Sequence, residues 1–145
     1  MQIGSSFTGN NPSNDGNGGN AYVVLAEVMY VGTGSCSALA SGVTCTNKNN
    51  YVFLQYIDFG NRSLQINSVT VQSALGSPSG ATINANGYVQ NYLTDANAVA
   101  SMIGGFFQTQ LTDGQVAYVV ETFFASPDLN FTAYPAGGIH SINFF

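Results

Sequence analysis

Apolar and polar residues follow one another in short runs along most of the chain, which is the pattern of β-strands. AYVVLAEVMYV (residues 21–31) and YVFLQYIDF (51–59) are rich in β-branched and aromatic residues and are flanked by turn-forming residues. GQVAYVVETFF (114–124) has the same character. The three segments predict strong, largely buried strands.

Weaker patterns predict the remaining strands. In RSLQINSVTVQ (62–72) the apolar residues change face, which predicts a bulge or bend near Asn67 and Ser68. GATINANGYVQNYL (80–93) predicts a weaker pair of strands around an Asn86-Gly87 turn. LNFTAY and IHSINFF, joined through PAGG, predict a terminal hairpin over residues 129–145.

One segment has the pattern of a helix. TDANAVASMIGGFF begins with Thr94 or Asp95 as a cap and ends at a glycine pair, and its apolar residues share one helical face: Ala98, Val99, Met102 and Ile103. A short helix is expected near 95–104. Seven or eight strands with one helical crossover predict an all-β fold, a single β-sandwich that is either immunoglobulin-like or a jelly roll.

The N-terminus has a pattern of its own. In MQIGSSFT, Met1, Ile3 and Phe7 project to one side and polar or small residues to the other, as in a strand. GNNPSNDGNGGN (9–20) follows and contains no side chain suited to a core. Residues 1–20 are therefore predicted to be an extended arm with a flexible tether, and residues 21–145 the sandwich domain. The arm could pair with a sheet edge of its own domain or of a second subunit, and a frayed terminus is the alternative.

Charge is scarce. Charged residues are 6% of the chain, with Lys48 and Arg62 the two cations against seven carboxylates. Without a basic patch, neither nucleic acid nor an anionic membrane surface is an expected partner. The most apolar run, residues 21–31, is too short to span a membrane and contains Glu27. A surface of neutral hydrogen-bonding groups also changes little between pH 7 and pH 2, which suits an acidic exterior.

Cys36 and Cys45 lie in a loop-like stretch and predict a disulfide. Two thiolates without further Cys or His ligands cannot complete a zinc site, and the spacing is unlike a Cys-x-x-Cys redox pair. A local disulfide indicates an oxidising location or a hyperthermophile. MQIGSSFTGN has no signal-peptide pattern, so either an export signal has been removed or the protein is not exported by that route.

No constellation of catalytic residues is apparent. His140 is the sole histidine and has no nominated partner, and the carboxylates are scattered without calcium-binding spacing. No phosphate-binding or dinucleotide motif is present. We therefore predict a non-enzymatic protein without metal or cofactor. Asn61-Arg62-Ser63 and Asn130-Phe131-Thr132 are glycosylation acceptors, with Asn61, at an expected turn, the better placed.

Several motifs carry a family resemblance. YVFLQYIDFGNRSLQINSVTV, with Gly60-Asn61 followed by Leu64, Ile66, Val69 and Val71, resembles the strand-turn-strand pattern of secreted crenarchaeal proteins. LTDGQVAYVV and NFTAYPAGGIHSINF are similar to the closing strands of the same domains. Such domains form the outer β-sandwich of archaeal pilins and archaellins, and a related sandwich builds archaeal thread filaments by donor-strand complementation. Pilins and archaellins begin with a long hydrophobic helix that this sequence does not contain, so a type IV assembly mechanism is not expected unless that helix has been removed. Thread-like subunits instead lend an N-terminal strand to the next subunit.

The resemblance implies a self-assembling extracellular filament subunit on the cell surface, with copies of itself as partners and MQIGSSFT as the assembly strand. One alternative is a single-jelly-roll capsid, penton or decoration protein of a virion. A second is a secreted adhesion, S-layer or glycan-binding module, which would need an exposed aromatic patch.

Overall fold

The computed structural model describes residues 19–66, 68–101, 111–125 and 138–145, with the backbone alone described at 138–142 and 144. Eight elements occur in these ranges. They are β1 (Ala21–Tyr30), α2 (Thr33–Ser37), β2 (Tyr51–Gly60), β3 (Gln65–Ile66), β4 (Val69–Thr70), the 3-10 helix η1 (Ala96–Ala98), β5 (Val116–Ala125) and β6 (Gly138–Phe144). The described protein is thus mostly β.

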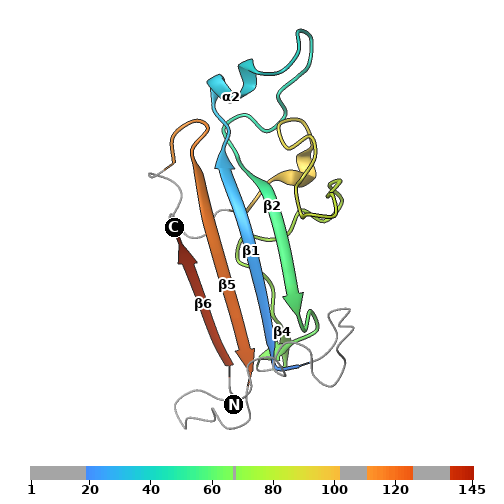
Figure 1. Cartoon of the computed structure of the whole chain (residues 1–145), viewed down its shortest axis with the longest axis vertical. Helices are drawn as coiled ribbons and strands as arrows, with labels where there is room; N and C mark the ends of the chain where they lie inside the picture. The colour runs from blue at the N-terminus through green and yellow to red at the C-terminus, as the bar shows by residue number, and fades with distance from the viewer. Residues whose placement is uncertain (1–18, 67, 102–110, 126–137) are drawn as a thin grey trace. The chain divides into compact units, whose positions relative to one another are not determined.

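Four strands form one sheet in the order β2-β1-β5-β6, and neighbouring arrows run in opposite directions (Figure 1). Backbone hydrogen bonds at the strand ends agree with antiparallel pairing: Tyr30 N donates to Gln115 O (3.2 Å), and Tyr118 and Phe145 exchange two bonds (3.2 and 3.0 Å). The three strong strands predicted from the sequence are confirmed as β1, β2 and β5.

Burial along these strands follows from their places in the sheet. β1 lies between β2 and β5, and its residues are buried or half-buried throughout. In β5, Ala117, Val119 and Phe123 are buried, whereas Tyr118 between them is exposed. β5 therefore has one face in the core and one face at least partly in solvent, as expected of an antiparallel strand.

The predicted bulge or bend near Asn67 and Ser68 falls between two paired strands, and Asn67 itself lies outside the described residues. β3 and β4 pair as an antiparallel two-stranded sheet with Gln65 opposite Thr70 and Ile66 opposite Val69. Ser68 has φ 63°, the left-handed conformation that tight hairpin turns require. The change of apolar face in this stretch is thus caused by reversal of the chain and not by a bulge in one strand.

The predicted Asn86-Gly87 turn is confirmed, but the strands on either side of it are shorter than predicted. Gly87 has φ 82°, and the Asn84 side-chain carbonyl accepts hydrogen bonds from the backbone N–H groups of Asn86 (2.9 Å) and Tyr88 (3.0 Å). Ile83 and Val89 form a single antiparallel bridge. The arms around the turn therefore pair at one bridge instead of forming two continuous strands.

The predicted helix near 95–104 is wrong over the part that the structure describes. Asp95 does cap a helix, accepting from Asn97 N, but η1 ends after Ala98. Val99 is extended and bridges to Val52, and Ala100 N donates to Tyr51 O (2.9 Å). Pairing with β2 outweighs the helical pattern of the apolar residues, while Met102 and Ile103 lie outside the described residues. The short helix α2 was not predicted.

The described residues do not show the predicted β-sandwich, either immunoglobulin-like or jelly roll. The described residues contain six strands and no second large sheet facing the first, so they show no sandwich. LNFTAY at 129–134, expected to pair with the last strand, lies outside the described residues, as does the arm at 1–18. β6 pairs with β5.

The chain divides into two compact units, which we name by their contents. Among the described residues, the hairpin unit comprises 19–24, 58–66, 68–72, 120–125 and 138–143, and the disulfide unit comprises 25–57, 73–101, 111–119 and 144–145. The long strands contribute residues to both units. The division into an arm at 1–20 and a domain at 21–145 stays a prediction, because residues 1–18 lie outside the described residues.

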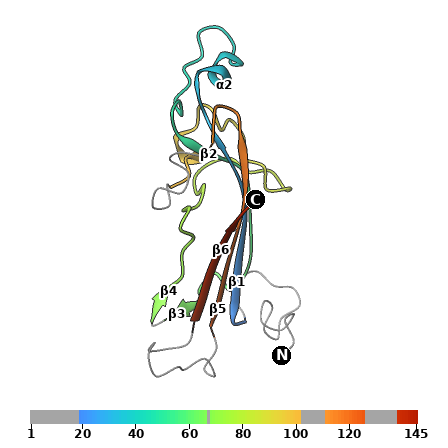
Figure 2. The same cartoon turned by 90° about the vertical axis from the view of Figure 1, so that its left-hand side faces the viewer.

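Within the hairpin unit, Tyr22 and Phe123 stack with ring centroids 5.9 Å apart. Tyr22 also donates to Asp58 (3.1 Å), whose carboxylate binds Arg62 through two hydrogen bonds of 2.6 and 2.7 Å. Figure 2 shows the β3–β4 hairpin beside the ends of β5 and β6 that belong to this unit. An aromatic stack and an ion pair thus anchor the residues around the hairpin.

Candidate functional site

The predicted assembly residues Met1, Ile3 and Phe7 lie outside the described residues, but the point where the tether joins the sheet is described. Asn61 Nδ2 donates to Gly19 O (2.9 Å), and Ala125 N donates to Asn20 O (2.8 Å). The end of the tether is therefore held in the hairpin unit, beside the first residue of β1.

One edge of the four-stranded sheet is covered. In the disulfide unit, β2 forms bridges between Val52 and Val99 and between Gln55 and Tyr88. The backbone bonds Tyr56 N to Gly87 O (2.8 Å), Val89 N to Leu54 O (2.9 Å) and Ala100 N to Tyr51 O (2.9 Å) extend this cover. Residues 87–100 thus satisfy polar groups that an outer strand would otherwise expose.

The other edge is formed by β6, which is the last strand of the sheet among the described residues. Natural edge strands discourage pairing with other chains through Lys, Pro, inward-pointing charge or very short length. GIHSINF has seven residues, no Pro and no Lys, Arg, Asp or Glu. The sequence of β6 therefore lacks these protections against strand addition.

The direction of the β6 backbone groups follows from its pairing with β5. Phe145 exchanges both hydrogen bonds with Tyr118, so its N–H points toward β5. Because direction alternates along an antiparallel strand, the N–H of Ser141 also points toward β5 and that of His140 points away. The backbone N–H of His140 thus faces the outer edge of the sheet. The structure does not describe its side chain.

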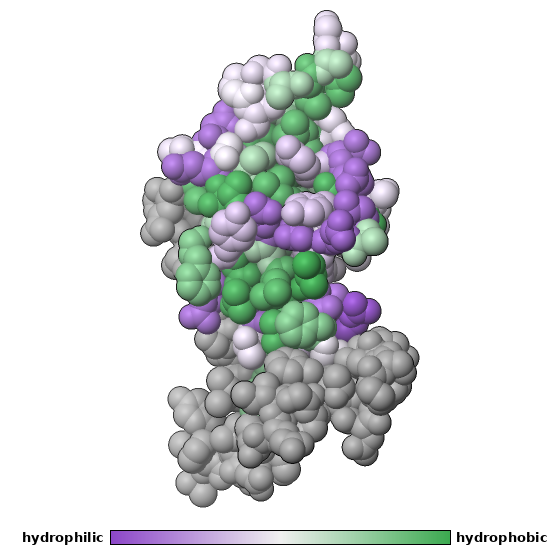
Figure 3. Space-filling model, viewed as in Figure 1, coloured by the Kyte–Doolittle hydropathy of each residue, from purple (hydrophilic) through white to green (hydrophobic). Residues whose placement is uncertain are grey.

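Apolar side chains reach the surface near this edge. Tyr118 and Phe145, paired across β5 and the end of β6, are 56% and 78% exposed. Figure 3 shows apolar patches interrupted by polar residues on the face of the molecule that it presents. Exposed aromatic residues of this kind are typical of surfaces that make contacts.

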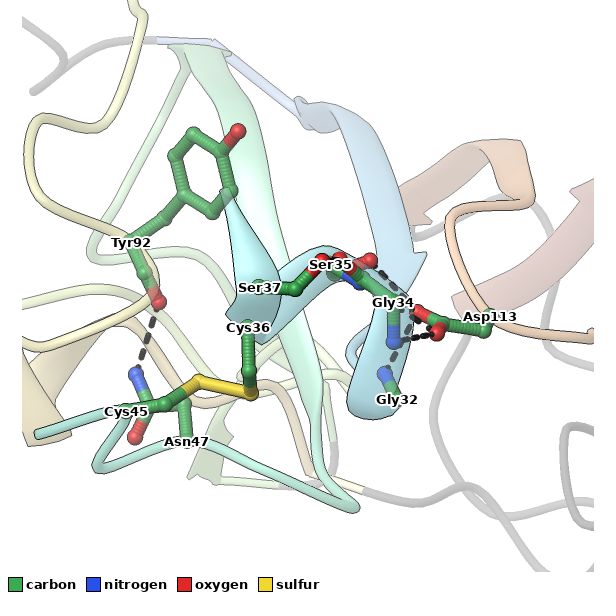
Figure 4. Close-up of a disulfide and its surroundings, with 9 residues drawn as sticks. All are labelled: Gly32, Gly34, Ser35, Cys36, Ser37, Cys45, Asn47, Tyr92 and Asp113. Carbon is green, nitrogen blue, oxygen red and sulfur yellow. Dashed lines mark hydrogen bonds between the residues drawn. A yellow bond between two sulfur atoms is a disulfide. The ribbon is translucent and has the colours of Figure 1, made fainter. Parts of the chain in front are cut away.

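The predicted disulfide is present. Cys36 and Cys45 are joined, with an S–S distance of 2.11 Å and a Cα–Cα distance of 5.6 Å (Figure 4). Both cysteines pack against a core of Met29, Val31 and Val52. The bridge therefore holds the loop that follows β1 against the core of the disulfide unit.

A carboxylate clasp holds the other side of this loop. Asp113 accepts hydrogen bonds from the backbone N–H groups of Gly32 (2.7 Å), Gly34 and Ser35 and from the Ser35 hydroxyl (Figure 4). The Ser35 hydroxyl bond, followed by the backbone bonds, lowers the pKa of Asp113 below its ordinary value although burial opposes the shift. A Cβ on Gly32 would come within 2.5 Å of the Asp113 carboxyl carbon, so glycine makes this approach possible.

Asn47 fixes the segment that covers β2. Its side chain is 1% exposed, and Nδ2 donates to Tyr92 O (2.8 Å) and Asp95 O (2.7 Å). Sequence reasoning identified neither Asn47 nor the role of Asp113, because both contact residues far away in the chain. A Gly-x-Gly-Ser loop before the first cysteine was the available signal for the clasp.

Of the two predicted glycosylation acceptors, the structure describes the surroundings of Asn61 only. The Asn61 amide is engaged at both ends: Nδ2 donates to Gly19 O, and Oδ1 accepts from Ser63 N (2.9 Å). A glycan on Asn61 Nδ2 would have to be compatible with this tether contact or break it. Asn130 lies outside the described residues. Glycosylation at either site stays a prediction.

Other described carboxylates contribute to the fold. Asp58 binds Arg62, Asp95 caps η1, and Glu121 is buried. Within the described ranges, no three His, Cys, Asp or Glu side chains converge in a way that could hold a metal ion. Neither described helix has the length and apolarity needed to cross a membrane.

Comparison with known proteins finds no matching family model, no matching curated protein and no matching solved structure. The resemblance to archaeal filament subunits consequently rests on the quoted sequence motifs and enters below as part of a proposal.

Proposed function

We propose that this protein is a non-enzymatic structural subunit that polymerises by strand exchange, with residues 1–8 of one copy pairing with β6 of the next. The observation that carries the proposal is the difference between the sheet edges. Residues 87–100 cover β2 over residues 51–56, whereas β6 is the last described strand and has a sequence without charge or proline. Such an edge is a template for an added strand.

The donor and acceptor segments are matched in length and chemistry. MQIGSSFT has eight residues and β6 has seven, so one added strand spans the edge. Neither segment contains Lys, Arg, Asp, Glu or Pro, so main-chain hydrogen bonds can form along the pair without burying a side-chain charge. Main-chain bonds would supply affinity, and the alternate side chains would supply register.

The tether gives the donor strand the required reach. Ten residues separate Phe7-Thr8 from Gly19, where the chain is held by Asn61. A Gly- and Asn-rich coil of that length has an end-to-end distance on the order of 15 to 20 Å and extends to about 35 Å at most. A donor strand on such a tether can reach the sheet of an adjoining subunit.

The setting and the finer fold belong to the same proposal. The disulfide is consistent with an oxidising, extracellular location. The resemblance to archaeal thread and pilin domains supports a cell-surface filament built from immunoglobulin-like sandwiches. In that arrangement MQIGSSFT of one copy would contribute the strand beyond β6 in the sheet of the next copy.

Deleting residues 1–8 tests the proposal directly. We expect the truncated protein to fold, to stay monomeric by light scattering, and to bind a synthetic MQIGSSFT peptide but not a scrambled peptide of the same composition. Full-length protein should form filaments visible by electron microscopy. A full-length protein that remains monomeric and ignores the peptide would exclude strand exchange.

Two neighbouring proline substitutions test which edge receives the strand. His140→Pro removes an N–H that points away from β5, so the fold should persist while peptide affinity falls at least tenfold. Ser141→Pro removes an N–H that points toward β5, so it should destabilise the sheet itself. Equal peptide affinity for wild type and His140→Pro would show that β6 is not the acceptor edge.

A further inference from the structure

The hairpin unit contains an apolar groove beside Phe123. The groove has a volume of about 430 Å³, and it is lined by Ile66, Val69, Thr70, Val71, Gln72 and Phe123. These residues come from the β3–β4 hairpin, the two residues after it, and β5. The groove is more than ten times the volume that one water occupies in the liquid, about 30 Å³.

The lining indicates the chemistry of an occupant. It contains no ionisable side chain, and Val69 is 67% exposed at its rim. Phe123 contributes the buried aromatic surface. An uncharged segment with apolar side chains would bury the exposed surface of Val69 without leaving a charge unpaired, whereas a charged ligand would find no partner among the lining residues.

We propose that this groove receives the apolar row Met1, Ile3 and Phe7 of a second copy when its arm adds to β6. The inference rests on the proposed function and adds the site that would fix the register of the added strand. Three observations support this occupant: the uncharged lining, the uncharged alternating arm, and the location of the groove in the same unit as β6 residues 138–143.

The spacing of strands in a sheet is compatible with this contact. β6 pairs with β5, on which Phe123 lies, so a strand added beyond β6 would be about 10 Å from β5 at about 4.8 Å per strand. Alternate side chains of an added strand would point to the Phe123 side of the sheet. Residues of the β3–β4 hairpin line the same groove as Phe123.

The test measures binding of MQIGSSFT to the protein that lacks residues 1–8. Val69→Asp places a charge in the groove and should weaken peptide binding at least tenfold. Val43→Asp is the matched control, since Val43 is 49% exposed in the disulfide unit and should leave affinity unchanged. Thr70→Trp, which fills the groove without adding charge, should also weaken binding, and circular dichroism should report a native fold for all three.

A double-mutant cycle measures whether Phe7 of the peptide interacts with Val69 in the groove. Phe7→Ala in the peptide should weaken binding to the unsubstituted protein several-fold but should have little further effect on Val69→Asp. If Val69→Asp binds like Val43→Asp while His140→Pro blocks binding, the groove inference is overturned and strand addition to β6 stands. If the peptide binds no variant and polymerisation survives deletion of residues 1–8, the proposed function fails first.

The same experiments distinguish binding of the arm to the groove of its own copy from binding to the groove of a second copy. In that case full-length protein would stay monomeric at every concentration, and the free peptide would bind the truncated protein but not the full-length protein. That result would overturn the commitment to a second copy. Mixed filaments of isotopically labelled and unlabelled protein, with cross-copy contacts between Phe7 and Val69 seen by solid-state NMR, would support it.

Discussion

The two units of this protein differ in how their surfaces are closed. In the disulfide unit, the covalent bridge, the Asp113 clasp and the buried Asn47 amide hold long loops in place, and residues 87–100 cover the β2 edge. In the hairpin unit, a groove is open beside Phe123 and most of the β6 edge has no further described strand. In this protein, which has few charged residues, the β2 edge is therefore protected by the loop residues 87–100 and not by charged side chains.

Removing the disulfide should have the largest effect on this contrast. Replacing both Cys36 and Cys45 with serine releases a small loop, and the chain-entropy estimate is a loss of about 2.5 to 3 kcal/mol in the free energy of unfolding. Denaturant titration of the oxidised wild type and the double variant measures the change. Hydrogen exchange should increase in residues 31–50 more than in the β3–β4 hairpin, and a uniform increase would contradict a local role for the bridge.

The Asp113 clasp should make stability depend on pH. Its hydrogen bonds lower the pKa of the folded carboxyl, so the stability that it contributes is present above the ordinary value of about 3.9 and is lost as pH falls through the lowered folded value. Thermal melts from pH 6 to pH 2 should show a drop for wild type. Asp113→Asn should be less stable at pH 6 and flatter across the range, and parallel curves would argue against the clasp.

This clasp qualifies the expectation of acid resistance drawn from the composition. Few groups titrate, but Asp113 joins two loops that are far apart in the sequence. A single carboxylate with several donors can therefore matter more for acid stability than the low overall charge indicates.

Val69 should show the smallest effect on stability. Its side chain is 67% exposed, so Val69→Ser should change the free energy of unfolding by no more than about 0.5 kcal/mol. The same variant should reduce polymerisation if the groove receives the arm. A large loss of stability in the monomer would show that Val69 belongs to the core of the hairpin unit instead.

The strands with strong patterns could be predicted because burial in the centre of a sheet demands continuous apolar sequence, as in β1 and the first half of β2. The helix prediction at 95–104 failed for a related reason. The spacing of Ala98 and Val99 satisfies a helical face, but Val99 is extended and bridges to Val52, and Ala100 N donates to Tyr51 O, so tertiary pairing with β2 overrides the local helical pattern.

By itself, the sequence determined the mostly β character, the disulfide between Cys36 and Cys45, and the turn at Asn86-Gly87, because each depends on residues that are close together in the chain. The tertiary structure decided which edge of the sheet is covered, where Asp113 and Asn47 place their hydrogen bonds, and how the hairpin and Phe123 form a groove. These features join segments tens of residues apart, and pairing at that range depends on the whole folded chain and not on any local pattern.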